Sequence, residues 1–367
     1  MPTNSKLFIG AMSGTSHDAV DVSLLSITKK NIKLESFNSI KIPKNLSDEI
    51  SNTINNNLIS LSELGELNKK IGLIFAKAIS KMIDKNVLKD PKSIVTGMSG
   101  QTIRHEPDIK NNFSTQIGDP NIVSVLTGTT VVSDFRNMHI AKGGEGAPLV
   151  PEFHAELFKS KKESRIILNI GGISNYTYVK TDGSYFGTDT GPGNALMDAY
   201  CSKVLGLEFD RNGSIAEKGS VIDKELKKLL LNSFFKKKSP KSTGKELFNF
   251  KYMSKNLLKQ DKKDILATLV EFTAITISNA IKKEKHDFKN VYVCGGGSKN
   301  KTLLKRISFH LNMPIKLTSD LGFDTQAIES MAFGWLAYRR VNNISSEVRL
   351  KNNRVMPALL GSVTKSI

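Results

Sequence analysis

Two strand–turn–strand units, far apart in the sequence, limit most strongly what this chain can fold into. In the first, the apolar run 7–9 leads through small residues into the alternating segment 20–24. In the second, the apolar run 165–170 passes through 171–175 into 176–179. A period of two predicts a strand, and small polar residues between two such runs predict a hairpin turn. Two similar hairpins, each opening one part of the chain, predict a duplicated architecture of two lobes around a cleft.

The remaining periodicity predicts an α/β protein, because strands alternate with helices. A third apolar strand, 291–294, ends in three glycines and enters a helix. Apolar residues at helical spacing follow Asp264, and a second apolar stripe runs from Ile328 to Leu336 with Asp324 or Thr325 as its expected N-cap.

A chain of 367 residues exceeds the size at which one hydrophobic core keeps growing, so two domains are expected. We place the boundary near Phe135. This gives an N-terminal lobe over 1–135, on which the C-terminal tail is expected to pack, and a C-terminal lobe over 136–367.

The chain is strongly basic, with 53 Lys and Arg against 35 Asp and Glu and a net charge of +18. Such a charge suits a nucleic-acid partner, anionic substrates or a solvated lysine-rich surface. More than half of it lies in 224–263, where thirteen lysines face three carboxylates and arginine is absent. Base recognition favours the planar fork of arginine, so we expect no nucleic-acid partner. A solvated face of a helical insert is the main interpretation, and an anion-attracting rim is the alternative.

Cysteine usage and hydropathy predict a cytoplasmic protein without a membrane partner. Cys201 and Cys294 both lie in apolar surroundings without a CxxC pattern, which is typical of a reducing compartment. The apolar run after Met1 is too short for a signal peptide, and no stretch elsewhere is expected to approach a membrane span.

Glycine-rich loops after the strands indicate a nucleotide. Glycine allows close backbone approach, and successive N–H groups form a nest for phosphate oxygens. The loops cover 13–16, 171–175 and 295–300, and the run 187–194 is similar to them. The patterns GxxxxGK[ST] and GxGxxG are absent, which excludes a P-loop and a dinucleotide-binding fingerprint.

Three carboxylates accompany these loops. Asp18 and Asp21 follow the first loop, where Mg²⁺ bridging phosphates needs anionic ligands. Asp189 stands between small residues, in an expected turn before a helix around 195–198. It is either a general base or a turn and N-cap residue, and the adjoining glycines favour the base.

Nine sequence blocks carry a specific resemblance. They are MSGTSHDAVD (12–21), GQTIRH (100–105), QIGDPN (116–121), GGEGAPLVP (143–151), LNIGGISN (168–175), DTGPGN (189–194), PKSTGKELF (240–248), VCGGG (293–297) and ESMAF (329–333). In content and order they resemble the anhydro-N-acetylmuramic acid kinases, over nearly the whole chain. This resemblance implies the actin/hexokinase/Hsp70-like fold, with duplicated βββαβα-type lobes around a nucleotide cleft.

The resemblance also implies a reaction. ATP and water act on 1,6-anhydro-N-acetylmuramic acid, the internal ether is opened, and N-acetylmuramic acid 6-phosphate and ADP leave. This reaction belongs to peptidoglycan recycling in the bacterial cytoplasm. The implied cofactors are ATP and Mg²⁺, and the implied assembly is a homodimer.

Site residues follow from the matching positions. Asp189 takes the place of the catalytic base, Asp18 is the metal-side carboxylate, and Arg136 is the expected partner of the lactyl carboxylate of the sugar. The nucleotide- and phosphate-binding positions are Gly14, Thr15, Ser16, His17, Asp18, Ala19, Val20, Asp21, Gly172, Ser174, Gly295, Gly296 and Gly297. The sugar-binding positions are Gln101, Thr102, Asp134, Arg136, Asn175 and Glu329.

The chain departs from the family pattern at four positions. Ser99 stands where histidine is usual, His17 and Ala19 replace leucine and glycine, and Thr188 replaces an aromatic residue. Two other functions stay open: an ordinary sugar or polyol kinase of the same fold, and a non-catalytic actin-like or chaperone-like ATPase. The histidines at 105, 139, 154, 286 and 310 show no metal-ligand spacing, and we expect them on the surface or in a satisfied core.

Overall fold

The computed structural model describes residues 6–56, 58–106, 112–283, 288–350 and 354–365. The chain forms two compact units: unit 1 holds Met1–Phe153 and Ala327–Ile367, and unit 2 holds His154–Gln326. The boundary expected near Phe135 is therefore wrong, because the chain leaves unit 1 only after Phe153 and returns to it at Ala327. Packing of the C-terminal tail on the N-terminal lobe is confirmed, since Ser362–Thr364 pairs with Thr130–Ser133 of unit 1.

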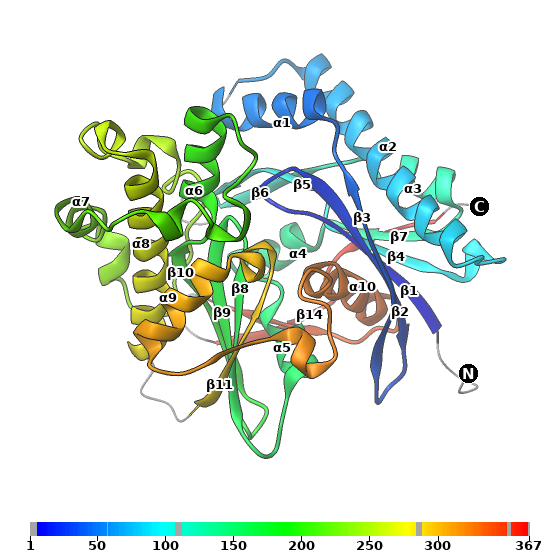
Figure 1. The fold of residues 1–367 in the computed structure, drawn as a ribbon. Helices are drawn as coiled ribbons and strands as arrows, with labels where there is room; N and C mark the ends of the chain where they lie inside the picture. Colours follow the sequence, from blue (N-terminus) through cyan, green and yellow to red (C-terminus); the bar gives the residue numbers. More distant parts are fainter. Residues whose placement is uncertain (1–5, 57, 107–111, 284–287, 351–353, 366–367) are drawn as a thin grey trace. The chain divides into compact units, whose positions relative to one another are not determined.

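A six-stranded mixed sheet forms the centre of unit 1 (Figure 1). Antiparallel pairing joins β1 to β2 and β2 to β3, whereas parallel pairing joins β1 to β4 and β4 to β7. In sheet order the strands are β15 (Ser362–Thr364), β7 (Thr130–Ser133), β4 (Val95–Met98), β1 (Lys6–Ser13), β2 (Ala19–Ile27) and β3 (Ile32–Lys41). The helices are α1 (Lys44–Asn56), α2 (Leu61–Lys85), α3 (Pro120–Thr127), α4 (Phe135–Ala141) and α10 (Ile328–Val341). Two hairpins, β5 (Gln101–Glu106) with β6 (Phe113–Ile117) and β13 (Ser346–Arg349) with β14 (Val355–Ala358), complete this unit, and α5 (Pro151–Phe158) crosses the boundary.

Unit 2 repeats the same strand order and directions in a five-stranded sheet. Antiparallel pairing joins β8 to β9 and β9 to β10, and parallel pairing joins β8 to β11 and β11 to β12. The strands are β8 (Ser164–Ile170), β9 (Ile173–Val179), β10 (Tyr185–Pro192), β11 (Phe288–Cys294) and β12 (Ile315–Leu317). The helices are α6 (Ala195–Tyr200), α7 (Asp223–Leu229), α8 (Lys262–Lys283) and α9 (Lys301–Leu311). The α/β class, both expected hairpins and the duplicated lobes are thereby confirmed.

Strand β1 is covered on both faces because its side chains alternate. Ile9 and Ala11 belong to the apolar core that also contains Ile71 and Phe75 of α2. The intervening residues face α10: the ring of Phe8 meets that of Tyr338, and Gly10 lies directly against the backbone of Ser330. The first loop therefore leaves a strand that is fixed from both sides.

Helix α10 begins later than the sequence predicts. Ala327 is its N-cap residue, and neither Asp324 nor Thr325 caps it. The Asp324 carboxylate instead accepts a hydrogen bond from the N–H of Gln326 at 2.8 Å, which makes a local turn before the helix. The expected N-cap is wrong because this carboxylate satisfies a donor in the turn.

Helix α8 corrects the expectation that no stretch approaches a membrane span. It is long and apolar enough to cross a membrane by length and composition, but 83% of its most apolar stretch is buried within the protein. Ile265, Leu269 and Phe272 lie in the main apolar core of unit 2, as their spacing predicts. A core helix of a globular unit passes the same test of length and composition.

The lysine-rich segment 224–263 contains α7 and several short 3-10 turns. Residues 239–244 have no helical structure and form a loop. Its aromatic side chains turn inward: Phe234 and Phe248 are buried and pack edge-to-face at 5.8 Å, and Phe235 stands against Phe272 of α8 at 5.6 Å. Aromatic rings packed inside the unit are not exposed for stacking on bases.

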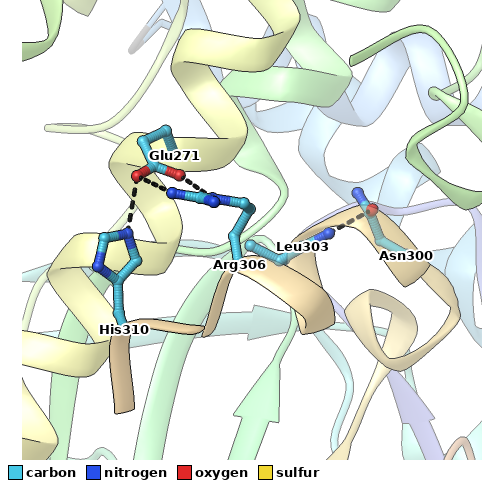
Figure 2. A network of polar contacts seen from close by, with 5 residues as sticks. All are labelled: Glu271, Asn300, Leu303, Arg306 and His310. Carbon is cyan, nitrogen blue, oxygen red and sulfur yellow. Dashed lines mark hydrogen bonds and ion pairs between the residues drawn. The ribbon is translucent and has the colours of Figure 1, made fainter. Parts of the chain in front are cut away.

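A buried carboxylate on α8 binds two side chains of α9 (Figure 2). Glu271, with a side chain 7% exposed, accepts from Arg306 Nε at 2.6 Å and Nη2 at 2.8 Å, and it contacts His310 Nε2 at 2.7 Å. Burial by itself raises the pKa of Glu271, but the hydrogen bonds and charges of Arg306 and His310 outweigh it and lower the pKa overall. Figure 2 also shows Asn300, whose side chain caps α9 by accepting from the N–H of Leu303 at 3.0 Å.

We expect Glu271→Gln to lower the free energy of unfolding by about 2 kcal/mol, a value reduced for the exposure of Arg306. A lowered folded-state pKa stabilises the protein above the unfolded-state value and loses this effect as the pH falls through the folded-state pKa. The free energy of unfolding in urea should therefore differ between wild type and Glu271→Gln by the whole expected amount at pH 7, and by less at about pH 3.5. Glu49→Gln, which removes an exposed ion pair with Lys70, should cost less than about 0.5 kcal/mol. An equal loss of unfolding free energy in Glu271→Gln at both pH values would contradict a stabilising role of the ionised Glu271 carboxylate.

Candidate active site

The first glycine-rich loop forms the tip of the β1–β2 hairpin in unit 1. A turn closes it, in which the N–H of His17 donates to the carbonyl of Gly14 at 3.2 Å and His17 takes a positive φ of 45°. The hydroxyl of Ser16 donates to Asp18 Oδ1 at 2.5 Å, and the side chains of Thr15, Ser16 and Asp18 are exposed. The loop thus presents hydroxyls, a carboxylate and turn backbone to solvent.

The last three expected residues of this motif lie in strand β2, beyond the loop. Ala19, Val20 and Asp21 pair with Lys41, Ile40 and Ser39 of β3. Val20 is fully buried, whereas Ala19 and Asp21 are half-buried. Of the three, Asp21 alone carries a polar side chain, so the exposed polar side chains of the motif are those at 15, 16 and 18.

Gln101 supports the loop from within unit 1. Its Oε1 accepts from the hydroxyl of Ser13 at 2.7 Å, and its Nε2 donates to the carbonyl of Gly14 at 3.3 Å. Ser99 contributes to the same network, because its Oγ accepts from the N–H of Ser13 at 3.2 Å and donates to the carbonyl of Gly100 at 2.7 Å. The side chain of Gln101 is fully buried, so it holds the loop in place. The hydroxyl of Ser99, at the position where histidine is usual in the family, is part of this framework.

A half-buried cation lies beside a glutamate in the same unit. Arg136, on α4, donates from Nη1 to the carbonyl of Gly146 at 2.8 Å. Burial lowers the pKa of Arg136, and the negative charge of Glu329 on α10 opposes that shift. His139 is buried, and burial together with the charge of Arg136 lowers the pKa of His139 to about 4. A neutral His139 accepts from the N–H of Gly146 at 3.0 Å, so the guanidinium and the imidazole both fix the 143–151 loop.

Two other expected sugar residues lie on the surface of unit 1 or near it. Asp134 is exposed, takes a left-handed conformation with φ of 58°, and accepts from Asn137 at 2.7 Å. Thr102, on β5, accepts through its hydroxyl from Gln116 of β6 at 3.2 Å. Asp134 directly precedes the helix that carries Arg136, so backbone connectivity keeps these two close.

Asp189 lies in strand β10, and the expected turn is wrong. It pairs with Asn175 of β9, and the register shifts between Asp189 and Gly191. The carboxylate is 8% exposed, and its Oδ2 accepts from the N–H of Thr243 at 2.9 Å and from the hydroxyl of Ser242 at 3.2 Å. The irregular end of a strand therefore carries a carboxylate whose orientation is fixed by residues more than fifty positions later.

The loop that fixes Asp189 is itself joined to β10. Its residue Lys241 accepts at the carbonyl from the N–H of Asp189 at 2.9 Å and donates from its N–H to Thr188 Oγ1 at 3.0 Å. Thr188, which replaces the usual aromatic, thus supplies the hydroxyl for this attachment. Burial and the positive charges of Lys283 and Lys237 lower the pKa of Lys241 to about 8, and the negative charge of Asp189 opposes this shift.

Three glycine-rich segments of unit 2 converge beyond the ends of β8 and β11. The carbonyl of Gly172 accepts from the N–H of Gly193 at 2.9 Å and from that of Ala195 at 3.0 Å. A β-carbon at Gly193 would lie 2.3 Å from the Gly171 carbonyl, and one at Gly297 would lie 2.3 Å from the Ile170 side chain. Only glycine allows this close approach of backbones.

The expected glycine loop after β11 is fixed by backbone contacts and leaves one residue open. Gly295 has a φ of 81° and donates its N–H to the carbonyl of Thr325 at 2.8 Å. A β-carbon at Gly296 would meet only the Asn194 amide, at 3.8 Å, and Gly296 is exposed.

Ser174, an expected phosphate-binding residue on β9, is not exposed. Its side chain is fully buried, and its hydroxyl finds no partner among the described residues. Asn175, its neighbour, is half-buried.

The match to a protein family shows what kind of protein carries the first loop of unit 1 and the Asp189 carboxylate of unit 2. The sequence model described as anhydro-N-acetylmuramic acid kinase matches residues 6–366. The chain belongs to this family. A relative from the gamma-proteobacterium EBAC31A08, named anhydro-N-acetylmuramic acid kinase, is 56% identical over 99% of both chains. One of the same name from Mannheimia succiniciproducens is 38% identical over 93% of this chain and 94% of its own.

Among solved structures, an activator of 2-hydroxyisocaproyl-CoA dehydratase from Clostridium difficile has a TM-score of 0.49. It is 13% identical and covers 92% of this chain and 96% of its own. The duplicated lobe of this member of the anhydro-N-acetylmuramic acid kinase family is established by the strand order and directions of its own two sheets.

Several residues that hold the kinase-family motifs in place were not predicted as site residues from the sequence. They are Ser13 and Ser99 around the first loop, and Lys241, Ser242 and Thr243 around Asp189. The signal for the last three was present, because the block 240–248 matches the family motif. What the sequence did not contain is the contact between that block and β10.

The carboxylates of the motif 12–21 suit a magnesium ion that is held mainly by phosphates and water. Within the described ranges, no group of three His, Cys, Asp or Glu side chains is arranged to hold a metal. Mg²⁺ at phosphate-transfer sites uses one or two carboxylates and keeps several waters, so the exposed Asp18 with Asp21 nearby in β2 is a fitting donor set. The converging glycine segments of unit 2 equally suit a ligand that needs close backbone approach.

Proposed function

We propose that this protein is an ATP-dependent kinase that opens 1,6-anhydro-N-acetylmuramic acid with water and phosphorylates O6. The products are N-acetylmuramic acid 6-phosphate and ADP, in the recycling of cell-wall sugars. The observation that carries the proposal is the nearly buried carboxylate of Asp189, held by Ser242 and Thr243 within two family motifs. A carboxylate fixed in this way is suited to act as a general base.

In the proposed reaction, Asp189 takes a proton from water while the water oxygen attacks C1 of the anhydrosugar. The C1–O6 bond breaks, and its electron pair stays on O6. The O6 atom then attacks the γ-phosphorus of ATP, the bond from that phosphorus to the β–γ bridging oxygen breaks, and ADP leaves. Asp189 returns its proton to solvent. In-line phosphoryl transfer depends mainly on positioning and on neutralisation of charge.

Phosphate binding is assigned to the glycine-rich segments of both units. In unit 1 the backbone and side chains of Gly14, Thr15, Ser16 and His17 contact phosphates, and Asp18 holds Mg²⁺ with Asp21 nearby. When bound, Mg²⁺ neutralises phosphate charge. In unit 2 the contacts come from Gly172, Gly295, Gly296 and Gly297. The buried Ser174 and Val20, and the half-buried Ala19, support these segments from within their strands.

Sugar binding is assigned to Arg136, Glu329, Asp134, Thr102 and Asn175. The guanidinium fork of Arg136 suits the lactyl carboxylate, because it pairs with a carboxylate through two parallel hydrogen bonds. Partial desolvation strengthens such a pair. Gln101, fully buried against the first loop, acts as a positioning residue.

We further propose that the protein is cytoplasmic and a homodimer, and that it binds neither nucleic acid nor membranes. The aromatic side chains of the lysine-rich segment pack inside unit 2, which supports the exclusion of nucleic acid. The burial of α8 supports the exclusion of membranes.

The deciding experiment incubates the protein with the anhydrosugar, ATP and MgCl₂ in ¹⁸O-labelled water and follows the products by mass spectrometry. We expect N-acetylmuramic acid 6-phosphate carrying one ¹⁸O at C1. Phosphorylation of an ordinary hexose, without turnover of the anhydrosugar, would favour an ordinary sugar kinase. ATP hydrolysis without any sugar product would favour a nucleotide-driven switch protein.

Replacement of Arg136 by lysine tests the sugar assignment. We expect Arg136→Lys to raise KM for the anhydrosugar at least about tenfold, because lysine keeps the charge but loses the bidentate fork. The kcat should change less than about threefold, since the contact exists before and during the reaction. Arg340→Lys is the matched control, because Arg340 also donates to a backbone carbonyl, that of Gly361, at 2.8 Å. Equal effects of the two variants on KM would remove the assignment.

A further inference from the structure

Two neighbouring cavities in unit 2 have only lysines as the charged residues among their described lining residues. Their volumes are about 300 and 520 Å³, and Lys283 lines both. The lysines of the two linings are Lys236, Lys237, Lys238, Lys241, Lys282 and Lys283. None of the described lining residues is Asp or Glu. We call the two cavities together the lysine pocket.

Two ammonium groups of the lysine pocket are held in place by adjacent backbone carbonyls. Lys241 Nζ donates to the carbonyl of Phe234 at 3.0 Å and lies 4.2 Å from the centre of the Phe234 ring. Lys283 Nζ donates to the carbonyl of Phe235 at 2.9 Å. An ammonium carries three N–H donors, so one carbonyl contact leaves donors for another acceptor.

The charge of this pocket is not balanced by ion pairs. In the part of the chain that the structure describes, the ion pairs include none with Lys237, Lys241 or Lys283. Lys283 and Lys237 contribute to the lowered pKa of Lys241, so the three cations repel one another, with Asp189 as the opposing charge. A bound anion would relieve this repulsion and stabilise the arrangement.

The walls of the pocket indicate more than a bare inorganic ion. Phe235 lines the first cavity and Phe186 the second, and Thr276 and Asn279 of α8 add polar groups to the first. A volume of about 300 Å³ lies at the lower end for small-molecule sites, where apolar walls combine with a few polar groups. The phosphate of such a ligand meets the lysines, and a ring with hydroxyls meets the aromatic and polar walls.

We propose that the lysine pocket is a second ligand site, for a sugar phosphate, and that its occupation regulates the Asp189 site. The pocket reaches that site through the chain itself. Lys241 lines the first cavity, its backbone pairs with Asp189 and Thr188, and the next two residues hold the Asp189 carboxylate. Thr190, the neighbour of Asp189, lines the same cavity. A ligand that binds the Lys241 ammonium group therefore acts on the loop that orients Asp189.

Calorimetric titration of the full chain with glucose 6-phosphate, inorganic phosphate and glucose tests the site. We expect both phosphate compounds to bind and glucose not to bind. Lys283→Gln should weaken glucose 6-phosphate binding about tenfold, as loss of a charge-assisted hydrogen bond does. Lys255→Gln is the matched control, because Lys255 is exposed, belongs to the lysine-rich segment 224–263 that supplies other lysines of the pocket, and lines neither cavity. It should change the affinity less than twofold.

The outcomes separate specific binding from attraction by net charge and from binding at the Asp189 site. No binding of glucose 6-phosphate, or equal weakening by both variants, overturns the site. Unchanged affinity in Lys283→Gln also overturns it, because the ligand then binds elsewhere. Regulation is tested by the kcat for ATP turnover, which should change on saturation of wild type and stay constant in Lys283→Gln. A change that persists in the variant contradicts the coupling.

Discussion

Asp189→Asn should lower the kcat for formation of N-acetylmuramic acid 6-phosphate by about 10³-fold, since general-base catalysis contributes on this order. The amide cannot accept the proton of the attacking water. Its carbonyl oxygen can still accept from the N–H of Thr243, so the fold should persist. KM for ATP should change little, because the nucleotide is assigned to other segments. The measurement is the initial rate of sugar phosphate formation, together with a thermal unfolding curve.

Ser242→Ala is the control that separates the base from its support. This change removes the hydroxyl that lies 3.2 Å from the Asp189 carboxylate but keeps the backbone N–H of Thr243 at 2.9 Å. We expect less than about a tenfold loss of kcat, because the net worth of one such hydrogen bond is about 1 kcal/mol. Normal turnover in Asp189→Asn would overturn the assignment of the base. A loss in Ser242→Ala as large as that in Asp189→Asn would assign catalysis to the loop.

Gly97→Ala should be the most destabilising single methyl addition in unit 1 apart from the same change at Gly10. A β-carbon at Gly97 would lie 2.0 Å from the carbonyl oxygen of Phe333, which belongs to the backbone of α10. Backbone cannot rotate away as a side chain does, so the helix must shift from β1 and β4. We expect a loss of about 3 kcal/mol or more in the free energy of unfolding. Fluorescence of the single tryptophan, Trp335 on α10, follows the urea unfolding of this unit.

Gly65→Ala is the matched control for this prediction. Gly65 lies in α2, and a β-carbon there meets no atom within 4 Å. Alanine at an open helical position should stabilise the protein by about 0.5–1 kcal/mol. Opposite signs for the two Gly→Ala changes are therefore expected. Equal small effects would show that α10 is not packed on the sheet as described.

Local features of the sequence determined the secondary structure and the family. The alternating apolar residues predicted both hairpins, and the stripe from Ile265 to Thr276 predicted a core helix. The ordered motifs from 12–21 to 329–333 identified the family. These predictions succeeded because they depend on residues that are neighbours in the sequence. The strand and helix periods, and the small residues required where backbones approach closely, are both local patterns.

Other features were decided by contacts between distant parts of the chain. The boundary was misplaced because α10 returns to the sheet of unit 1 through close contacts at Gly10 and Gly97. Asp189 was expected in a turn because small residues surround it in the sequence, but it lies in β10, just before a register shift. Lys241 was counted with a solvated charged face, yet it is half-buried against Phe234.

The sequence by itself thus determined which elements form, which lobes are repeated and which family motifs are present. The tertiary structure alone decided how Asp189 is oriented, which lysines share a pocket and where the last helix packs. The physical reason is one of range. Periodicity and turn chemistry act over a few residues, whereas the Asp189 carboxylate meets its donors 53 and 54 positions away. Only the folded chain brings those groups within hydrogen-bond distance.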